Sequence, residues 1–302
     1  MHGWIILDKP LGLGSTQGVS AVKRALRDGG YGKFKVGHGG TLDPLATGVL
    51  PIALGEATKL AGRMLDSDKV YEFTVRFGVE TDTLDLEGRV VAESAVRPTP
   101  ADVEAVLPRF VGAIEQVPPA YSALMVDGTR AYDRARSGQN VELASRLVTV
   151  FSLEVIASAG DEATLRAHVS KGTYIRSLAR DIARALGTVG HVSHLRRTRA
   201  GPFGLDAGPL GAISLDKLNA IGQGAALENV LLPLEAGLDG IPALTLGPEQ
   251  ARAVREGRVL TGLALPDGVC WARSGNTPLA LLRVEGGEGR VLRGFNLPDA
   301  AE

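Results

Sequence analysis

Strand-type and helix-type patterns of apolar residues are interleaved along most of this chain, which limits the folds open to it. Residues 70–77 alternate between apolar and polar side chains and predict a half-buried strand. Residues 147–156 and 163–169 flank a glycine-containing turn and predict a hairpin. Residues 173–186 carry apolar side chains at helical spacing, with Gly187 placed to end a helix. This mixed order indicates an α+β domain on a mixed or antiparallel sheet with flanking helices.

Two shorter helices are also predicted. Thr99-Pro100 has the residue types of an N-cap followed by a first-turn proline, which predicts a helix that runs to about Phe110. Residues 129–137 predict a second helix, which Gly138 would end.

The pattern changes near Ile241, after which a small β-rich unit is expected. One helix is predicted at 248–255, and three short apolar runs predict strands at 259–265, 279–284 and 291–295. A length of 302 residues suits about two domains. We therefore expect a larger domain at 1–236 and a smaller one at 237–302.

The composition is that of a globular protein, with 44% hydrophobic and 22% charged residues. The single cysteine, Cys270, excludes a disulfide within the chain and a cysteine-based metal site. The first residues lack the pattern of a secretory signal, and no apolar run approaches the ~18 residues of a membrane span. A cytoplasmic protein with no membrane partner is expected.

Positive charge is concentrated in two segments, although the net charge is only −1. Residues 163–205 contain eight basic side chains and one acid, and residues 20–40 contain five basic side chains and one acid. Such segregation is typical of a protein that binds a polyanion. Acids from elsewhere in the chain could also balance these charges in space, so the charges alone leave both interpretations open.

Residues 37–51 concentrate glycine and proline around a single carboxylate, that of Asp43. This density of glycine and proline requires a specific, turn-rich backbone path. Leu42, Pro44 and Leu45 flank the carboxylate, and such partly apolar surroundings with a nearby cation are where a carboxylate acquires a tuned role. An Asp-Pro pair also begins turns that carry no chemistry, so the residues alone do not decide between a turn and a catalytic site.

Residues 38–48 strongly resemble the catalytic segment of the bacterial tRNA pseudouridine synthase B family, whose members modify uridine 55 in the T loop. Six further segments fit the same family in the same order: Leu7–Pro10, Gly55–Lys59, Asp66–Tyr71, Pro119–Ala123, Ser170–Arg176 and His191–Arg197. The resemblance covers residues 3–205. The C-terminal part resembles, more loosely, the small PUA-type RNA-binding domain of these enzymes.

The resemblance implies a pseudouridine synthase fold and an isomerase that flips uridine out of the RNA. The enzyme breaks the N1–C1′ bond of the uridine and joins C5 to C1′. Asp43 corresponds to the nucleophile, and Arg176 corresponds to the arginine that pairs with it. Five further residues correspond to positions that bind the substrate: Tyr71, which stacks on the base; Tyr174 and Leu195, which line the base pocket; His38, which contacts or replaces the displaced nucleotide; and Lys59, which contacts phosphate.

The expected partner is the T arm of tRNA, gripped by the basic residues between Arg166 and Arg199. No DNA and no obligatory protein partner are expected, and the chain is predicted to be a monomer. The sequence has no phosphate-binding loop, dinucleotide fingerprint or credible metal cluster. His191 and His194 form a pair without a third ligand, so no metal and no cofactor are expected.

Two other functions stay open. The chain could be a non-catalytic RNA-binding or tRNA-folding module on the same scaffold, although the intact Asp43, Tyr71 and Arg176 argue against it. It could also be the catalytic subunit of a guide-RNA ribonucleoprotein, but its length and its lack of obvious partner-binding extensions disfavour that. Gly14 stands where the family usually has a hydroxyl residue, so no hydroxyl role is expected at that position.

Overall fold

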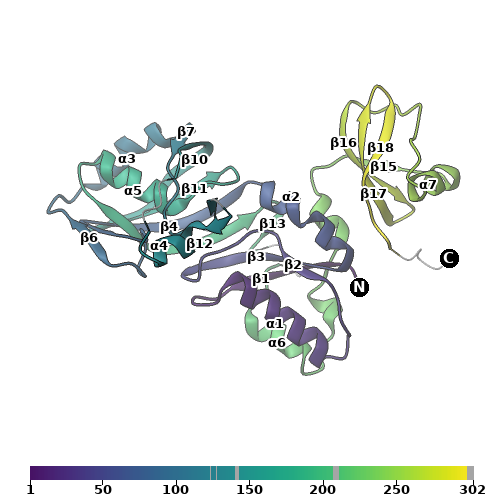
Figure 1. The fold of residues 1–302 in the computed structure, drawn as a ribbon, viewed down its shortest axis with the longest axis horizontal. Helices are drawn as coiled ribbons and strands as arrows, with labels where there is room; N and C mark the ends of the chain where they lie inside the picture. The colour runs from purple at the N-terminus through teal and green to yellow at the C-terminus, as the bar shows by residue number, and fades with distance from the viewer. Residues whose placement is uncertain (123, 127, 140–142, 207–210, 298–302) are drawn as a thin grey trace.

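The computed structural model describes residues 1–122, 124–126, 128–139, 143–206 and 211–297. Figure 1 shows a larger unit that holds the N-terminus and a smaller, C-terminal sheet beside it. None of the helices in these ranges is long and apolar enough to cross a membrane. Ala123, the last residue of one family-like segment, lies outside the described residues.

The larger sheet has ten strands within the described residues. They are β1 (Gly3–Lys9), β2 (Val36–His38), β3 (Ala46–Leu54), β4 (Lys69–Phe77), β7 (Gly112–Gln116), β10 (Arg146–Ala159), β11 (Glu162–Val169), β12 (Gly190–Ala200), β13 (Phe203–Gly204) and β14 (Leu232–Pro233). The strand order is β14-β1-β3-β12-β4-β11-β10-β7, with β2 beside β3 and β13 beside β12. Only the β3–β12 pair is parallel among these described pairs. The α+β class on a mixed sheet is confirmed.

Helices cover the larger sheet in two groups. On one half, α1 (Ser15–Asp28) and α6 (Leu215–Ile221) lie side by side; on the other half lie α3 (Pro100–Val106) and α5 (Ile175–Ala185) (Figure 1). The smaller elements are α2 (Ala61–Asp66), α4 (Ala131–Arg136), the 3₁₀ helices η1 (Gly55–Leu60), η2 (Leu107–Phe110), η4 (Leu227–Asn229) and η5 (Leu234–Leu238), and the strand pairs β5 (Val79–Thr81) with β6 (Val90–Glu93) and β8 (Met125–Val126) with β9 (Thr129–Arg130).

β3 is buried along nearly its whole length because protein covers both of its faces. Leu50 and Ile52 join the cluster under α1, whereas Val49 and Ala53 join the cluster around Trp4. A strand buried on both faces is a continuous apolar run without alternation, as the sequence of β3 is. The glycine-rich segment that carries Asp43 therefore leads directly into a rigid strand.

The predicted elements of the larger unit are confirmed with small shifts. The strand at 70–77 is β4, and the predicted hairpin is β10 with β11. α5 ends before Gly187, whose φ of 73° explains why glycine stands there. Helix α3 begins after Thr99, whose side chain accepts a hydrogen bond from the Asp102 amide, and η2 continues it to Phe110. Helix α4 begins at Ala131, later than predicted, because the two residues before it pair as β9.

The smaller sheet consists of β15 (Ala243–Thr245), β16 (Gly268–Ser274), β17 (Thr277–Glu285) and β18 (Glu288–Gly294), with α7 (Pro248–Arg255) beside it. The strand predicted at 259–265 is wrong. Leu260 makes a single bridge to Gly289, and Gly262 then turns the chain with a φ of 71°. The sheet instead uses Gly268–Ser274 as the strand β16. Leu281 and Phe295 pack in the same cluster as Trp4, so an apolar contact joins the two units.

Candidate active site

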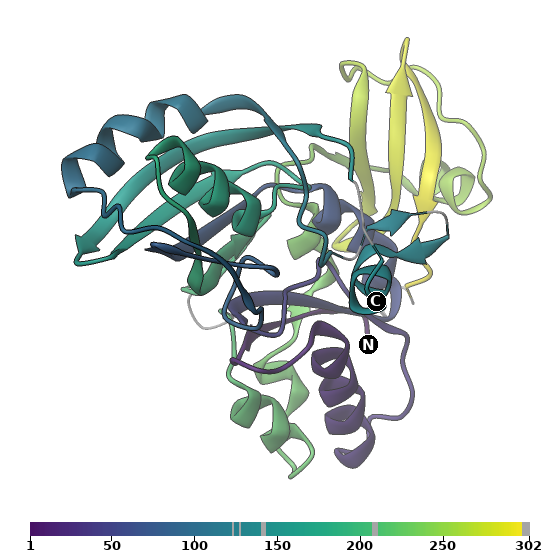
Figure 2. The ribbon, with the colours of Figure 1, turned by 60° about the vertical axis from the view of Figure 1, so that its left-hand side comes forward.

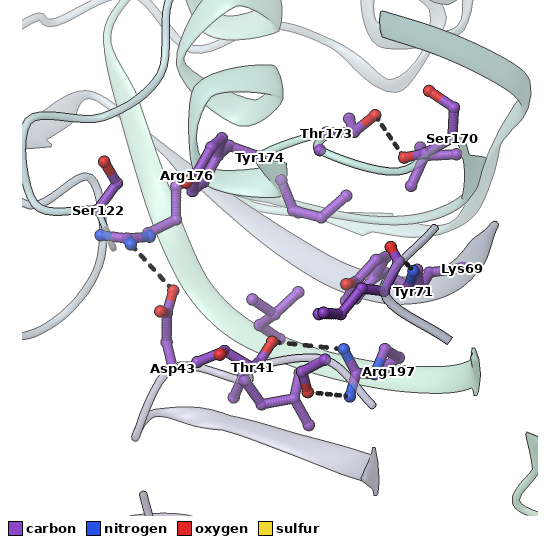
Figure 3. Close-up of a pocket in the computed structure, with 18 of the residues that line it drawn as sticks. Thr41, Asp43, Lys69, Tyr71, Ser122, Ser170, Thr173, Tyr174, Arg176 and Arg197 are labelled. Atoms are coloured by element: carbon purple, nitrogen blue, oxygen red, sulfur yellow. Dashed lines mark hydrogen bonds and ion pairs between the residues drawn. The ribbon is translucent and has the colours of Figure 1, made fainter. Parts of the chain in front are cut away.

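A pocket of about 300 Å³ opens between the segment that carries Asp43 and the start of α5 (Figure 3). Asp43 and Arg176 lie at one end of this pocket, and Tyr71 and Lys69 lie at the other. Tyr174, Leu195 and Arg197 also line it. The pocket therefore draws on β4, α5 and β12, which are far apart in the sequence.

Backbone and side-chain hydrogen bonds fix the loop that carries Asp43. The Gly39 amide donates to the Pro51 carbonyl (2.8 Å), and the Ala46 amide donates to the Asp43 carbonyl (3.0 Å). Ser15 Oγ, in the first turn of α1, donates to the Leu42 carbonyl (2.9 Å) and accepts from the Leu42 amide (2.8 Å). The carboxylate of Asp43 is held next to the pocket by these contacts, with 42% of its side chain exposed.

Arg176 places its guanidinium between two carboxylates. Its Nη2 lies 3.0 Å from Asp43 Oδ2, and its Nη1 lies 3.4 Å from Asp85 Oδ2 (the first pair is drawn in Figure 3). The same nitrogens donate to the carbonyls of Tyr121 (2.9 Å) and Thr83 (2.8 Å). The planar guanidinium is thus fixed in orientation, and it keeps a positive charge directly beside Asp43. Although Arg176 has the helical spacing of a surface residue, it is only 6% exposed.

Asp85 is a residue of this site that the sequence did not indicate. It is 8% exposed, and its Oδ1 accepts from Thr83 Oγ1 (2.6 Å) and from the Glu87 amide (3.0 Å). The preceding Leu84 has a φ of 62°, and its carbonyl accepts from the Val192 amide of β12 (3.0 Å). A short acidic loop gives no sequence signal for such a position, because the contact depends on a strand more than a hundred residues away.

Arg197 is a second residue whose place in this site the sequence did not indicate, because its charge groups it with the basic residues expected to bind RNA. It is 1% exposed, and its Nε donates to the Val49 carbonyl (2.8 Å). Its other two nitrogens donate to the carbonyls of Gly40 (3.1 Å) and Thr41 (3.4 Å), as Figure 3 shows. One buried guanidinium therefore ties the start of the Asp43 loop to the strand that follows it.

Two buried lysines support the walls of the pocket. Lys9 Nζ donates to the carbonyls of Leu13 (2.6 Å) and Pro44 (3.2 Å), so it connects β1 to the residue after Asp43. Lys69 Nζ donates to the carbonyls of Met64 and Leu65 (both 2.8 Å), where a cation suits the C-terminal end of α2. Burial lowers the pKa of each ammonium to about 8.

Three predicted base-binding residues, Tyr71, Tyr174 and Leu195, lie together on the pocket wall. Gln116 fixes the backbone of Tyr174, because its side chain accepts from the Tyr174 amide (2.7 Å) and donates to the Tyr174 carbonyl (3.1 Å). The guanidinium of Arg146 lies 4.7 Å from the centre of the Tyr174 ring. Two aromatic rings and one aliphatic side chain thus border the space next to Asp43.

His38 and Lys59 are not among the residues that line the pocket. His38 lies in β2, where its Nδ1 accepts a long hydrogen bond from the Gly40 amide (3.4 Å), and burial followed by the charge of Arg197 lowers its pKa. Lys59 Nζ lies 2.6 Å from Glu56 Oε2 and donates to the carbonyl of Gly294 (2.8 Å) in the C-terminal sheet. The structure brings His38 to the edge of the Asp43 loop, and it places Lys59 at the contact between the two sheets.

The eight basic residues between 166 and 199 all have partners inside the protein. Seven of them pair with carboxylates: Arg166 with Glu72 and Glu154, Lys171 with Asp66, Arg176 with Asp43 and Asp85, Arg180 with Asp181, Arg184 with Glu80, Arg196 with Asp8 and Arg199 with Asp68. The eighth, Arg197, donates to backbone carbonyls. In this segment the positive charges are balanced by partners within the protein. They therefore do not support the prediction that this segment binds the T arm of tRNA.

The surroundings of His191, His194 and Gly14 are those of structural residues rather than of a metal site. His191 is 5% exposed and donates from Nδ1 to the Val79 carbonyl (2.7 Å), whereas His194 is exposed. No cluster of three or more potential metal ligands occurs in the described part of the chain. Gly14 occupies the N-cap position of α1, and its amide donates to Gln17 Oε1 (2.7 Å).

Comparison with known proteins identifies the family. Residues 27–175 match the family described as TruB family pseudouridylate synthase (N terminal domain), and residues 176–239 match the tRNA pseudouridylate synthase B C-terminal domain. The tRNA pseudouridine synthase B of Novosphingobium aromaticivorans is 70% identical over 307 residues, covering all of both chains. The chain belongs to the TruB family of pseudouridylate synthases. The protein of the same name from Zymomonas mobilis is 57% identical, over 98% of this chain and 96% of its own.

Solved structures agree with TruB-family membership. An H/ACA ribonucleoprotein bound to a substrate RNA that contains 2′-deoxyuridine holds a chain with a TM-score of 0.73 and 26% identity, covering 98% of this chain and 86% of that one. The archaeal box H/ACA Nop10-Cbf5 complex gives 0.73 and 25%, covering 98% and 87%. Five of the seven TruB-like sequence segments supply residues to the pocket, so the family's distinctive sequence is concentrated around this one cavity.

Proposed function

We propose that this chain converts uridine 55 in the T loop of tRNA to pseudouridine, with Asp43 as the catalytic nucleophile. Pseudouridine formation in tRNA follows from membership of the TruB family and from relatives that carry the name tRNA pseudouridine synthase B. The observation that supports the nucleophile is the carboxylate of Asp43, fixed beside the pocket by an ion pair to Arg176. Arg176 Nη2 lies 3.0 Å from Asp43 Oδ2, so the guanidinium holds the carboxylate in position beside the pocket.

The reaction is an isomerisation, and its atoms balance without a co-reactant. The N1–C1′ bond breaks, the detached uracil turns in the pocket, a C5–C1′ bond forms, and the proton on C5 leaves while N1 gains one. Asp43 attacks C1′ or C6 of the nucleotide, or removes a proton from C2′ to give a glycal. In each route Arg176 holds the carboxylate toward the reacting nucleotide, and Asp85 holds Arg176.

The target base must leave its stack to reach Asp43. Tyr71 offers a ring face for the flipped uracil, and Tyr174 and Leu195 close the sides of the space. A cavity of about 300 Å³ suits one nucleoside rather than a stacked pair. We propose that His38, at the edge of the Asp43 loop, contacts the displaced nucleotide and that Lys59 contacts phosphate after release from Gly294.

We further propose that residues 1–236 form the catalytic domain and residues 237–302 a PUA-like RNA-binding domain. The separate core around Leu282 and Val254 supports this division. The chain is proposed to act as a monomer without a guide RNA. The alternative, a non-catalytic tRNA-folding module, would bind the same RNA without turnover.

The test is tritium release from tRNA transcripts that carry C5-labelled uridine. Wild-type protein alone is expected to release one equivalent of tritium per tRNA over many turnovers. A transcript with cytidine at position 55 is expected to release no tritium. Asp43→Asn should abolish release, whereas the isosteric change Asp66→Asn, at an exposed ion pair, should not. Wild-type rates with Asp43→Asn would refute the assignment of the nucleophile, and failure of any turnover would favour the folding module.

A further inference from the structure

Five basic side chains gather on α1 and on the segment that follows it. They are Lys23, Arg24, Arg27, Lys33 and Lys35, and all five are exposed. We refer to them as the α1 basic surface. Asp28 is the single acid within residues 20–40.

Four of the five charges of the α1 basic surface have no partner among the described residues, in contrast to those of residues 166–199. Across the described residues, no carboxylate lies within 4.0 Å of Lys23, Arg24, Lys33 or Lys35, and none of the four side chains makes a hydrogen bond. Arg27 pairs only with its neighbour Asp28, and both of these side chains are largely exposed. The structure therefore separates the two basic segments of the sequence: one is neutralised internally, and the other presents its charge to solvent.

The α1 basic surface is linked to the pocket at both ends of its segment. At its start, Ser15 exchanges two hydrogen bonds with Leu42, the residue before Asp43. At its end, β2 leads into Gly40, which lines the pocket. Figure 2 shows the chain after α1 rising along the outside of the molecule toward β2. The segment thus begins at a residue that contacts the pocket wall, Ser15, and ends at a residue that lines the pocket, Gly40.

The helical rise gives the distance of these charges from Ser15, which contacts the pocket wall through Leu42. At 1.5 Å per residue, Lys23 and Arg24 lie about 12 to 14 Å along α1 from Ser15, and Arg27 lies about 18 Å from it. This distance exceeds the reach of the single nucleotide that occupies the pocket. It lies within the reach of the nucleic acid to which that nucleotide is attached.

We propose that the α1 basic surface binds the phosphate backbone of the substrate RNA outside the nucleotide that enters the pocket. This inference rests on the proposed function, which makes an RNA the molecule that approaches Asp43. Exposed Lys and Arg side chains without acidic partners provide sequence-independent contacts to phosphate, and such contacts position an RNA without reading its bases. An acidic protein segment would suit the charge equally, but the continuity of the segment with the pocket favours the polyanion that the pocket must receive.

Equilibrium binding tests the proposal, measured in the Asp43→Asn background so that no turnover occurs. The variants are Lys23→Gln with Arg24→Gln, and Lys33→Gln with Lys35→Gln. Arg109→Glu is the control, because it makes the same change of −2 in charge at an exposed residue outside the surface. The probes are a full tRNA transcript and an isolated T-arm hairpin, each titrated between about 0.05 and 0.3 M salt.

A phosphate contact with a salt slope of about 0.7 is worth about fivefold in Kd at 0.1 M salt. Each double variant should therefore bind the full transcript about 25-fold more weakly than the control, with a salt slope about 1.4 smaller. An equal loss with the hairpin would place the contacted phosphates in the T arm, and a loss confined to the full transcript would place them elsewhere in the tRNA. Either result supports the proposal.

The proposal is overturned if either double variant binds the full transcript with the Kd and the salt slope of Arg109→Glu. That result would favour an acidic protein segment as the partner of the α1 basic surface. Tritium release by the protein with an intact Asp43 is measured in parallel, because it reports on the proposed function separately. Turnover combined with unchanged binding of the double variants would refute this inference alone.

Discussion

Asp85 shares the Arg176 guanidinium with Asp43, and Asp85→Asn isolates what that sharing contributes. The substitution keeps the shape of the side chain and an oxygen that can accept from Thr83 Oγ1 and the Glu87 amide. It removes the charge that lies 3.4 Å from Arg176 Nη1. Arg176 would then keep one carboxylate and its two backbone carbonyl partners, so its guanidinium would be held less firmly beside Asp43.

The magnitude can be bounded from the geometry. At 3.4 Å and an effective dielectric constant of about 20, the gross attraction is about 5 kcal/mol. Desolvation offsets much of this energy, and a hydrogen bond to a charged group contributes about 1.5 to 3 kcal/mol net. We therefore expect kcat to fall by about 10- to 100-fold and the free energy of unfolding to fall by about 1 to 3 kcal/mol.

Multiple-turnover tritium release over a range of tRNA concentrations gives kcat and KM, and urea unfolding measures the effect on stability. The matched control is Glu87→Gln, an exposed acid two residues further along the same loop. It should change neither quantity by more than about 1.5-fold or 0.5 kcal/mol. A wild-type kcat in Asp85→Asn, or a loss seen only in KM, would contradict the argument that Asp85 orients Arg176.

Three further predictions concern the support of the Asp43 loop. Ser15→Ala removes both hydrogen bonds to Leu42, so it should lower kcat several-fold and the free energy of unfolding by about 1 to 2 kcal/mol. Turnover and urea unfolding measure the two effects, and unchanged values would show that the loop keeps its conformation without Ser15. Gly48→Ala should lower Tm by about 10 °C or prevent folding, because the φ of Gly48 is 100° and the new Cβ would lie 2.1 Å from the Arg197 carbonyl oxygen. Calorimetry measures this Tm, and a value within about 2 °C of wild type would exclude the clash. Burial lowers the pKa of Lys9 to about 8, so the unfolded state binds more protons between pH 8 and 10.5, and stability rises with pH across that window. Lys9→Met should remove about 3 kcal/mol of this rise, as measured by urea unfolding at a series of pH values. If the free energies of unfolding of wild type and variant changed with pH in parallel, the prediction would be wrong.

The periodic elements of the fold could be predicted from the sequence because their signals are local. β4 alternates and α5 has a helical stripe, so both were identified within one or two residues. The strand at 259–265 was predicted wrongly since an apolar run says nothing about its pairing partner. In the structure that run crosses the β17–β18 hairpin with a single bridge, at Leu260.

The candidate site was only partly predictable, for a related reason. Asp43 stood out because of the glycine and proline around it, and Arg176 through the family resemblance. Asp85 and Arg197 did not, because their contacts depend on where β12 runs between β3 and β4. The charge count was also misleading: residues 166–199 have the greater number of cations, yet most of their acidic partners come from other parts of the chain, such as Asp8 in β1 and Glu72 in β4.

The insertion of β12 between β3 and β4 has a consequence for how the protein is made. β3 ends at Leu54 and β4 begins at Lys69, so the two strands leave the ribosome almost together. The strand that must lie between them, Gly190–Ala200, is synthesised more than a hundred residues later. At ~5–20 residues per second, several seconds pass before β12 can pair with Ala46–Gly48 of β3 and with the inner edge of β4. Asp43 is therefore translated well before β12, which supplies Leu195 and Arg197 to the pocket beside it.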